Sequence, residues 1–323
     1  MFKDKKMLKY TLKRLLHSIP LILAIIIISF FIVHWMPGDP IVTMLGDKAP
    51  EEQIIRMRNE LNLDKPILEQ FQIWVKAIIH MDFGKSILWN EPVIEIVKNR
   101  IEPTFLLAII GISISMLLGI PLGIISAKTY GKFSEKMLSI LSLLSISLPA
   151  FWIAIVMIQI FGVKFQIFPV AGYHAVADSG FLIALKDLML PGLVLGIMHS
   201  GQIGRMTKAS MLEIMEYDYL RTARANGISE HKVLNYYAFK NALPSITVVI
   251  GFSFAALLAG AVVIEQIFNI PGIGNLTITA ILNRDYPIIQ VMLLFIAVIF
   301  IVVNIITDIV CAFINPKARY DNE

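Results

Sequence analysis

The sequence predicts an all-α membrane protein with six transmembrane helices. Hydrophobic residues make up 57% of the 323 residues and charged residues only 16%, whereas soluble domains are about 45–50% apolar and about 25% charged. The apolar residues lie in long runs, and about 20 such residues are enough for a helix to cross the hydrocarbon core of a bilayer. Most charged residues lie between these runs, as expected for loops in water.

Six apolar segments are long enough to span the membrane. They cover residues 12–35, 104–127, 137–162, 188–206, 246–268 and 288–313. The first is longer than the roughly 7–15 apolar residues of a signal peptide, so we interpret it as a retained helix. Pro121, Pro149 and Pro191 lie in or at the ends of spans, where each permits a kink. The fourth has the weakest pattern because His199, Gln202 and Arg205 interrupt it.

Basic residues predict the orientation of these spans. With the N-terminus inside, the inner segments contain 17 Lys and Arg and the outer segments 11. Eight of the outer ones lie in the long segment 36–103, where acidic residues outnumber them and loop length weakens the positive-inside rule. We therefore expect a multi-pass protein of the cell membrane with both termini and residues 205–245 in the cytoplasm.

The spans divide the chain into four parts. They are the cytoplasmic N-terminus with the first helix (1–35), an extracytoplasmic insert (36–103), a five-helix core (104–313) and a cytoplasmic tail (314–323). Two amphipathic patterns within the insert predict a small helical cap. That cap either packs on the spans or docks a protein that delivers a substrate.

Small residues recur at every fourth position in three spans. The sets are Gly111, Ser115, Gly119 and Gly123 in the second span, Gly192, Gly196, Ser200 and Gly204 in the fourth, and Gly251, Ala255 and Ala259 in the fifth. Such sets let helix backbones approach closely in lipid. They predict either tight helix packing or a surface that lines a pathway or slides.

The positions of the charges argue against a transporter driven by protons or sodium. No Asp, Glu, Lys or Arg lies near the middle of a span; Arg205, Glu265 and Asp308 lie near span ends. Transporters driven by protons or sodium usually carry an intramembrane carboxylate. The best match to a phosphate loop, Leu122–Thr129, lacks the required glycines, so we expect no ATP site on this chain.

Other chemistry is also not expected. The histidines form no pair at i, i+4 and there is one cysteine, Cys311, so we predict no metal site, no disulfide and no catalytic residue. The net charge of +4 comes from basic residues dispersed among loops, which gives no reason to expect nucleic acid.

Residues 217–244 form a charged island between apolar segments. Its first part, 218–226, predicts a short amphipathic helix. One side of this helix would present Tyr219, Leu220 and Ala223, and another Arg221 and Arg224. The small Thr222 and Ala223 would let a partner approach the backbone closely.

Gly227 and Pro244 mark the boundaries of the second part of the island. Gly227 stands where a helix commonly ends in a left-handed turn. A second helix is predicted to start at Ser229 and to end at Leu243-Pro244 before the fifth span.

This island resembles the ATPase-docking loop of ATP-binding-cassette (ABC) importer permeases. Arg221-Thr222-Ala223, followed after three residues by Gly227, is similar to their Glu-Ala-Ala-x3-Gly motif. It departs in having Arg-Thr for Glu-Ala and a later Leu243-Pro244. Both departures resemble the peptide/nickel class, with Asp-Tyr-[Ile/Val/Leu]-Arg-Thr-Ala-Arg-Ala-x-Gly and a later Asn-Ala-Leu-Pro.

Further motifs extend this resemblance over the whole chain, and the insert after the first span resembles the B-type subunit of that class. The motifs are Pro37-Gly38-Asp39-Pro40, Leu61-x-Leu63-Asp64-Lys65-Pro66, Asp82-Phe83-Gly84-x-Ser86, Pro103-Thr104, Leu148-Pro149-x-Phe151-Trp152 and Phe268-Asn269-x-Pro271-Gly272-Ile273-Gly274.

The resemblance implies a type I ABC importer permease fold and a permease subunit for short peptides, dipeptides or oligopeptides. It implies as partners a second homologous permease, two cytosolic ATPases that bind ATP and Mg, and an extracytoplasmic binding protein. The implied ATPase contacts are Tyr219, Arg221, Thr222, Ala223, Arg224 and Gly227. The implied structural motif residues are Pro37, Gly38, Asp39, Pro40, Pro244, Pro271, Gly272 and Gly274.

Two alternatives stay open at this point. A permease for nickel or a metal–chelator complex uses the same machinery, and nothing in these residues separates it from a peptide permease. A membrane receptor or scaffold whose cytosolic hairpin only recruits a partner belongs to a different class.

Overall fold

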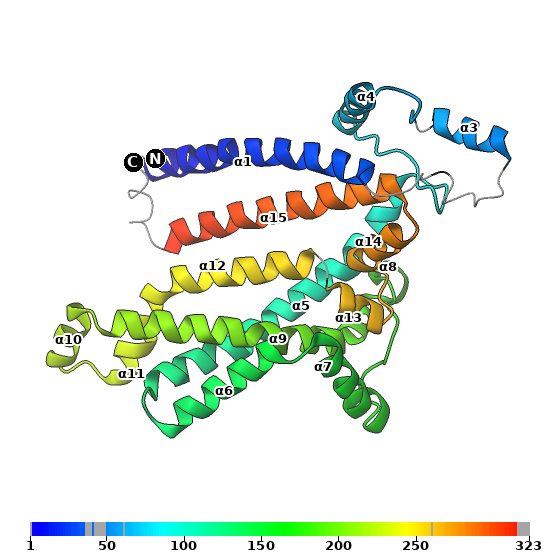
Figure 1. The fold of residues 1–323 in the computed structure, drawn as a ribbon. Coiled ribbons are helices and arrows are strands. Elements are labelled where there is room, and N and C mark those ends of the chain that lie inside the picture. The colour runs from blue at the N-terminus through cyan, green and yellow to red at the C-terminus, as the bar shows by residue number, and fades with distance from the viewer. Residues whose placement is uncertain (1, 36–40, 42–49, 61, 260, 315–323) are drawn as a thin grey trace.

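The computed structural model describes residues 2–35, 41, 50–60, 62–259 and 261–314, and within them the chain folds almost entirely into helices (Figure 1). The helices in chain order are α1 (Phe2–His34), α3 (Glu51–Glu60), α4 (Ile67–Ile79), α5 (Val93–Lys128), α6 (Phe133–Ser147), α7 (Ala150–Met157), the π-helix η1 (Ile158–Lys164), α8 (Val176–Ser179), α9 (Phe181–Met215), α10 (Asp218–Ala225), α11 (Glu230–Lys232), the π-helix η2 (Val233–Ala238), α12 (Phe239–Leu258), α13 (Val262–Ile267), α14 (Ile273–Leu282) and α15 (Tyr286–Ile314).

Five helical stretches of the described chain are long and apolar enough to cross a membrane. They are Thr11–Ile32 within α1, all of α5, all of α9, Glu230–Leu258 from α11 to α12, and α15. The bent pair formed by α6 and α7–η1 supplies a sixth when it is counted as one span. The prediction of an all-α membrane protein with six spans is thus confirmed.

The third span is not the single segment 137–162 that the sequence predicts. α6 and α7–η1 meet at an angle of 101°. The break lies at Leu148, whose backbone is extended (ψ 135°), and Pro149, which precedes the first residue of α7. Proline has no N–H to donate and disfavours helical geometry in the residue before it, so the apolar run continues while the helix stops.

The fifth span also differs from the predicted 246–268. α12 ends at Leu258, and the chain then turns into the short helices α13 and α14. The predicted helix end at Leu243-Pro244 is wrong as well, because Pro244 lies inside α12. Prolines are tolerated in spanning helices where neighbouring groups compensate for the lost hydrogen bond.

Small residues bring α5 and α9 into direct backbone contact. A Cβ added to Gly119 would lie 2.6 Å from the Ser200 carbonyl oxygen, and one added to Gly123 would lie 2.5 Å from that of Gly204. The Ser115 hydroxyl donates a hydrogen bond of 3.0 Å to the Gly196 carbonyl oxygen. Tight packing, one of the two roles predicted for these residues, is therefore confirmed in the second and fourth spans.

The fifth span packs on the sixth in the same way. A Cβ added to Gly251 of α12 would lie 2.1 Å from Thr307 Oγ1 of α15. α15 in turn pairs with α1, where Arg14 and Asp308 form an ion pair of 3.0 Å. Each span is thus held by contacts that require a small or polar residue at a particular position.

The insert packs on the C-terminal end of α1. Its two predicted helices are present as α3 and α4, and α4 places Phe71 and Trp74 against Phe30. His34 shares a hydrogen bond of 3.0 Å with Gln70. α5 starts at Val93, within the predicted insert, and the motif 37–40 lies outside the described residues.

The contact between α5 and α9 gives the first prediction. Gly123→Val would push a branched side chain into the backbone of α9, and overpacking of this kind costs about 1–3 kcal/mol. We expect a lower thermal unfolding temperature for the purified variant in detergent. Leu117→Val, at a position of α5 that is 73% exposed, is the control and leaves that temperature unchanged. Equal unfolding temperatures for both variants would contradict the packing role.

Candidate functional site

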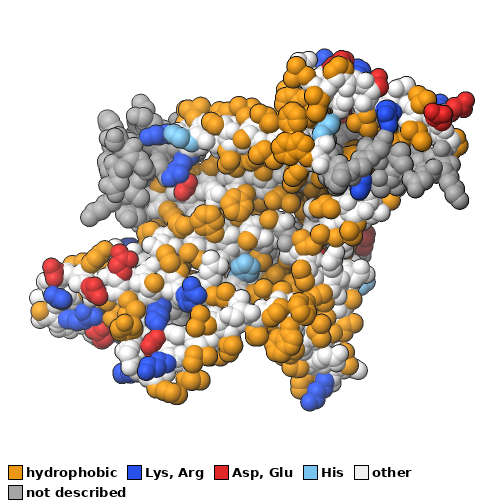
Figure 2. Space-filling model, in the orientation of Figure 1, with side chains coloured by type: hydrophobic (Ala, Val, Ile, Leu, Met, Phe, Trp, Pro, Cys, Tyr) orange, Lys and Arg blue, Asp and Glu red, His pale blue; other side chains and the backbone are white. Residues whose placement is uncertain are grey.

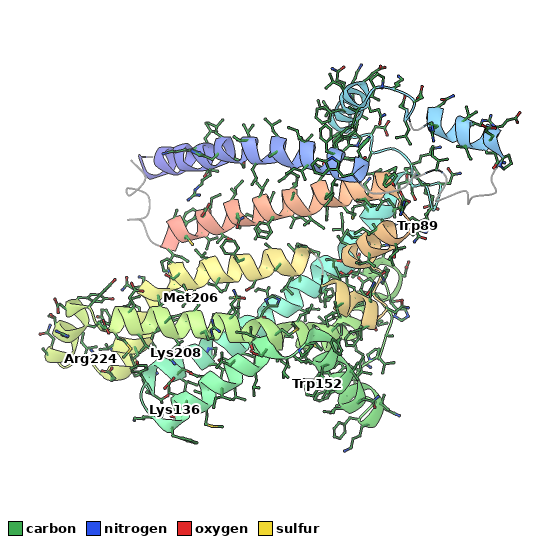
Figure 3. The ribbon with its side chains drawn as sticks, viewed as in Figure 1. Trp89, Lys136, Trp152, Met206, Lys208 and Arg224 are labelled. Atoms are coloured by element: carbon green, nitrogen blue, oxygen red, sulfur yellow. The ribbon has the colours of Figure 1, made fainter. Side chains whose placement is uncertain are left out.

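The charged island projects from one end of the helical bundle. α10 and α11 lie at the end where α1 begins and α15 finishes, whereas α3, α4 and α14 lie at the opposite end (Figure 1). Arg224, Lys208 and Lys136 lie toward the α10 end and Trp89 toward the other (Figure 3). The two ends of the bundle therefore carry different sets of charged and aromatic groups.

A buried apolar cluster attaches α10 to the spans. Leu220 is 0% exposed and Ala223 8%. They belong to what we call the inner-end cluster, after the orientation that the sequence predicts, whose members are Ala127, Met211, Ile214, Leu220, Ala223, Val233, Leu234, Ala238, Ala242 and Ile246. Because the cluster joins the ends of α5, α9 and α12, α10 is held against these spans and does not hang from them as a free loop.

Gly227 makes the turn between α10 and α11 in the predicted left-handed conformation, with φ +77°. Its N–H donates to the Arg224 carbonyl oxygen at 3.0 Å, and the Ile228 N–H donates to that of Ala223 at 3.2 Å. Ser229 then precedes the first residue of α11, as the sequence predicts. Glycine reaches a positive φ without the steric cost of a side chain, which explains its place here.

An ion pair closes this turn. Two guanidinium N–H groups of Arg224 donate to the two carboxylate oxygens of Glu230, each at 3.0 Å. This bidentate geometry is the strong form of the interaction. The Glu230 carboxylate raises the pKa of Arg224. Arg224 thereby joins α10 to α11 across Gly227.

A second polar contact joins α10 to α12. The Asn241 side-chain amide donates to the Tyr219 hydroxyl at 3.0 Å and to the Tyr237 carbonyl oxygen at 2.8 Å. Tyr219 stays exposed despite this contact. The α10–α11 hairpin is therefore held against the spans by the buried inner-end cluster and by the contact of Asn241 with Tyr219, and its turn is closed by the contact of Arg224 with Glu230.

The outward face of α10 carries side chains that the rest of the described chain does not cover. The Arg221 side chain is 73% exposed and lies 3.5 Å from Asp218, which is also exposed. The Thr222 hydroxyl donates back to the Asp218 carbonyl oxygen at 3.1 Å. Tyr217 and Ala225 flank this face in exposed positions.

The structure separates the predicted contact residues into two groups. Tyr219, Arg221, Thr222 and Gly227 are exposed. Ala223 was expected to face a partner and instead packs in the inner-end cluster. Ala223 points inward because it lies three residues after Leu220, and positions three apart in a helix share a face.

Two of the predicted structural motif residues, Gly272 and Gly274, lie at the other end of the bundle against the buried carboxylate of Glu265, whereas Pro244 lies inside α12. The Glu265 oxygens accept hydrogen bonds from the Thr104 hydroxyl at 2.7 Å and the Asn275 N–H at 2.8 Å. The Ile273 N–H donates to Thr104 at 2.8 Å. A Cβ added to Gly272 would lie 2.4 Å from the Glu265 carboxyl carbon, so this position requires glycine.

A second buried carboxylate fixes the loop before α5. Asp285 precedes α15, and one of its oxygens accepts from the Ser86 hydroxyl at 2.5 Å and from the N–H groups of Ile87 and Leu88 at 3.1 and 3.0 Å. Ser86 belongs to the predicted Asp82–Ser86 motif. The reason for a serine there is this contact with a residue far along the chain.

Sequence reasoning placed Glu265 near a span end and did not consider Asp285. Neither residue was assigned to the motifs that it holds together. A signal was present, because each carboxylate lies at the edge of an apolar segment next to a helix N-terminus, where anions are favoured. What pattern alone does not provide is the distant partner, Thr104 or Ser86.

The described residues contain no group of three His, Cys, Asp or Glu side chains that could hold a metal ion.

Two family models match the chain. The model described as "Binding-protein-dependent transport system inner membrane component" matches residues 119–320. The one described as "Binding-prot-dependent transport system membrane comp, N-term" matches residues 7–108. One solved structure with a similar fold is the inward-facing MetNI methionine ABC transporter. It has a TM-score of 0.56 and 14% identity, and the match covers 68% of this chain and 96% of that one.

Curated relatives align from end to end. A protein named as a peptide transport system permease in Brucella abortus (strain 2308) is 40% identical over 310 residues, covering 96% of this chain and 98% of the relative. The glutathione transport system permease protein GsiC of Escherichia coli (strain K12) is 34% identical over 314 residues, covering 97% and 100%. The chain therefore belongs to the family of binding-protein-dependent transport system inner membrane components.

Proposed function

We propose that this chain is the permease subunit of an ATP-driven importer for short peptides. The observation that carries the substrate class is the end-to-end alignment with a relative named for peptide transport and with one named for glutathione, which is itself a tripeptide. Both alignments include the insert as well as the core. The shared substrate chemistry is a small molecule with peptide bonds and charged ends.

In the importer, this chain would have four kinds of neighbour. A second homologous permease completes the pathway, two cytosolic ATPases bind ATP and Mg, a binding protein delivers the peptide outside, and lipid surrounds the spans. The absence of a phosphate loop in the sequence supports the assignment of hydrolysis to partner subunits. This chain acts as the transport component.

Coupling of ATP hydrolysis to transport would start at the exposed face of α10. Arg221 and Thr222 contact an ATPase, with Tyr219 beside them, while Arg224 and Gly227 hold the hairpin in shape. Ala223 acts on the inner side, in the inner-end cluster. Because this cluster fastens α10 to α9 and α12, a force on α10 tilts these spans and opens the pathway alternately to the two sides.

The arrangement of the ends supports the predicted orientation. α10, α11, the start of α1 and the end of α15 lie together, and the insert lies at the far end (Figure 1). We place the first group in the cytoplasm and the insert outside, in agreement with the distribution of basic residues.

A bulky side chain on the exposed face of α10 tests whether ATP hydrolysis is coupled to transport through this helix. Thr222→Trp places an indole where the ATPase would approach, while the permease itself folds normally because this side chain is exposed. We expect uptake and ATPase co-purification to fall about thirtyfold, the effect of losing a contact of about 2 kcal/mol. Full association together with full uptake would exclude this face.

Ala223→Trp, at the next residue of the chain, is the matched comparison for Thr222→Trp. It forces the same indole into the inner-end cluster, so it lowers the amount of folded permease in the membrane and not only its association with the ATPase. Quantitative blotting of membrane fractions separates the two variants.

Orientation is tested by thiol labelling of intact cells in a Cys311→Ala background. An impermeant maleimide added outside is expected to label Leu68→Cys in the exposed part of α4 and to miss Lys232→Cys in α11. The reverse pattern would overturn the proposed topology.

The substrate class is tested in vesicles that contain the complete complex and its binding protein. We expect ATP-dependent accumulation of a radiolabelled dipeptide and none of nickel or a nickel chelate. Accumulation of nickel alone would replace the peptide assignment. If neither the dipeptide nor nickel accumulates while the ATPases still bind, the result would favour the alternative function of a receptor or scaffold.

A further inference from the structure

One face of α9 is polar and uncovered in the described chain. His199, Gln202 and Arg205 follow each other at three-residue spacing; Gln202 and Arg205 are exposed and His199 is partly exposed. None of the three side chains has a hydrogen bond or ion pair with another described residue. These are the residues that weaken the fourth span as an apolar pattern.

Gln202, the middle residue of this face, points away from α5. Ser200 and Gly204 contact α5, and Gly201 lies against Ser145 of α6. With 3.6 residues per turn, Gln202 points about 160° away from Gly204. The contact with α5 therefore leaves Gln202 on the opposite side of α9, and Arg205 lies about 40° from Gly201, at the edge of the contact with α6.

The depth of this face makes lipid an unsuitable neighbour. Gly119 of α5 touches Ser200, so this part of α9 lies level with a part of α5 where Leu117 is 73% exposed. Apolar side chains cover much of the surface between the two charged ends (Figure 2). Unpaired amide and imidazole groups at this level are unfavourable in hydrocarbon, which leaves water or another protein as the neighbour.

The helix that carries this face also leads to α10. The helix runs without a break from Phe181 to Met215, and α10 begins at Asp218. The helix that carries the polar face is therefore joined directly to the hairpin that would receive the ATPase, so a movement of α10 changes the surroundings of Gln202.

We propose, on the basis of the proposed function, that His199, Gln202 and Arg205 line the water-filled route of the peptide and that the Arg205 guanidinium binds the peptide's carboxylate. The charges are complementary, because a free peptide ends in a carboxylate and Arg205 is the cation of this face. A guanidinium donates two parallel hydrogen bonds to such a group. Arg205 lies on the α10 side of Gln202, where the peptide leaves toward the cytoplasm.

The water-filled route is tested by the reactivity of single cysteines in the complete complex, reconstituted in lipid vesicles, in the Cys311→Ala background. A charged, water-soluble thiosulfonate is expected to modify Gln202→Cys at least about tenfold faster than Leu117→Cys, its control at the same depth, because a thiol must ionise in water to react. The reaction is measured without nucleotide and with ATP and vanadate. Equal, slow rates in both states, as expected if a second permease or lipid covers the face, would overturn the proposal.

The role of Arg205 is tested with the binding protein saturated by a dipeptide. Arg205→Gln is expected to lower the maximal uptake rate about tenfold, as for the loss of a charge-assisted hydrogen bond. Arg205→Lys retains the charge and restores most of that rate. Equal loss in both variants, or none in Arg205→Gln, would overturn the carboxylate contact.

Failure of this inference is distinct from failure of the proposed function. Peptide uptake by the unmodified complex is measured in the same vesicles and decides the function. Thiol reactivity at Gln202→Cys decides whether the face is in water, with or without peptide uptake.

Discussion

The close contact between α5 and α9 is the constraint on which the rest of the fold depends. In lipid, helices gain little from hiding apolar surface, so their association rests on van der Waals contact and interhelical hydrogen bonds. Gly119, Gly123 and Gly204 allow this contact, and the hydrogen bond from Ser115 to Gly196 adds a polar link. Once α5 and α9 are fixed, α6 and α12 pack beside them and one face of α9 is left free.

The two ends of the bundle are held by different physical means. At the α10 end an apolar cluster attaches the hairpin, and the polar groups lie at its edges. At the other end, the buried carboxylates of Glu265 and Asp285 hold loops that are distant in sequence. A buried carboxylate is favourable only when its hydrogen bonds are satisfied, so each of these groups fixes its loops in one arrangement.

This difference bears on how a permease would move. An apolar cluster tolerates small shifts because its contacts have no direction, whereas hydrogen bonds to a buried carboxylate require fixed geometry. The α10 end is therefore suited to transmit displacement, and the loops around Glu265 and Asp285 are suited to stay rigid. α9 connects the two ends as one continuous helix.

Much of the architecture could be predicted from the sequence. The helical class, the six apolar spans, the insert helices, the left-handed Gly227 and the start of α11 after Ser229 all follow from local signals, namely apolar runs, amphipathic spacing and residue conformational preference. The resemblance to importer permeases rested on ordered motifs, and the family matches confirm it.

Only the tertiary structure decided the rest. The sequence permits a kink at Pro149 but does not determine its size of 101°, and both this bend and the early end of α12 lie inside continuous apolar runs, where hydropathy does not separate a straight span from a broken one. The inward position of Ala223 and the partners of Glu265 and Asp285 depend on residues distant in the chain. Local pattern determines which segments are helices, and contacts between distant segments determine which face of each helix is buried and where an apolar run must turn.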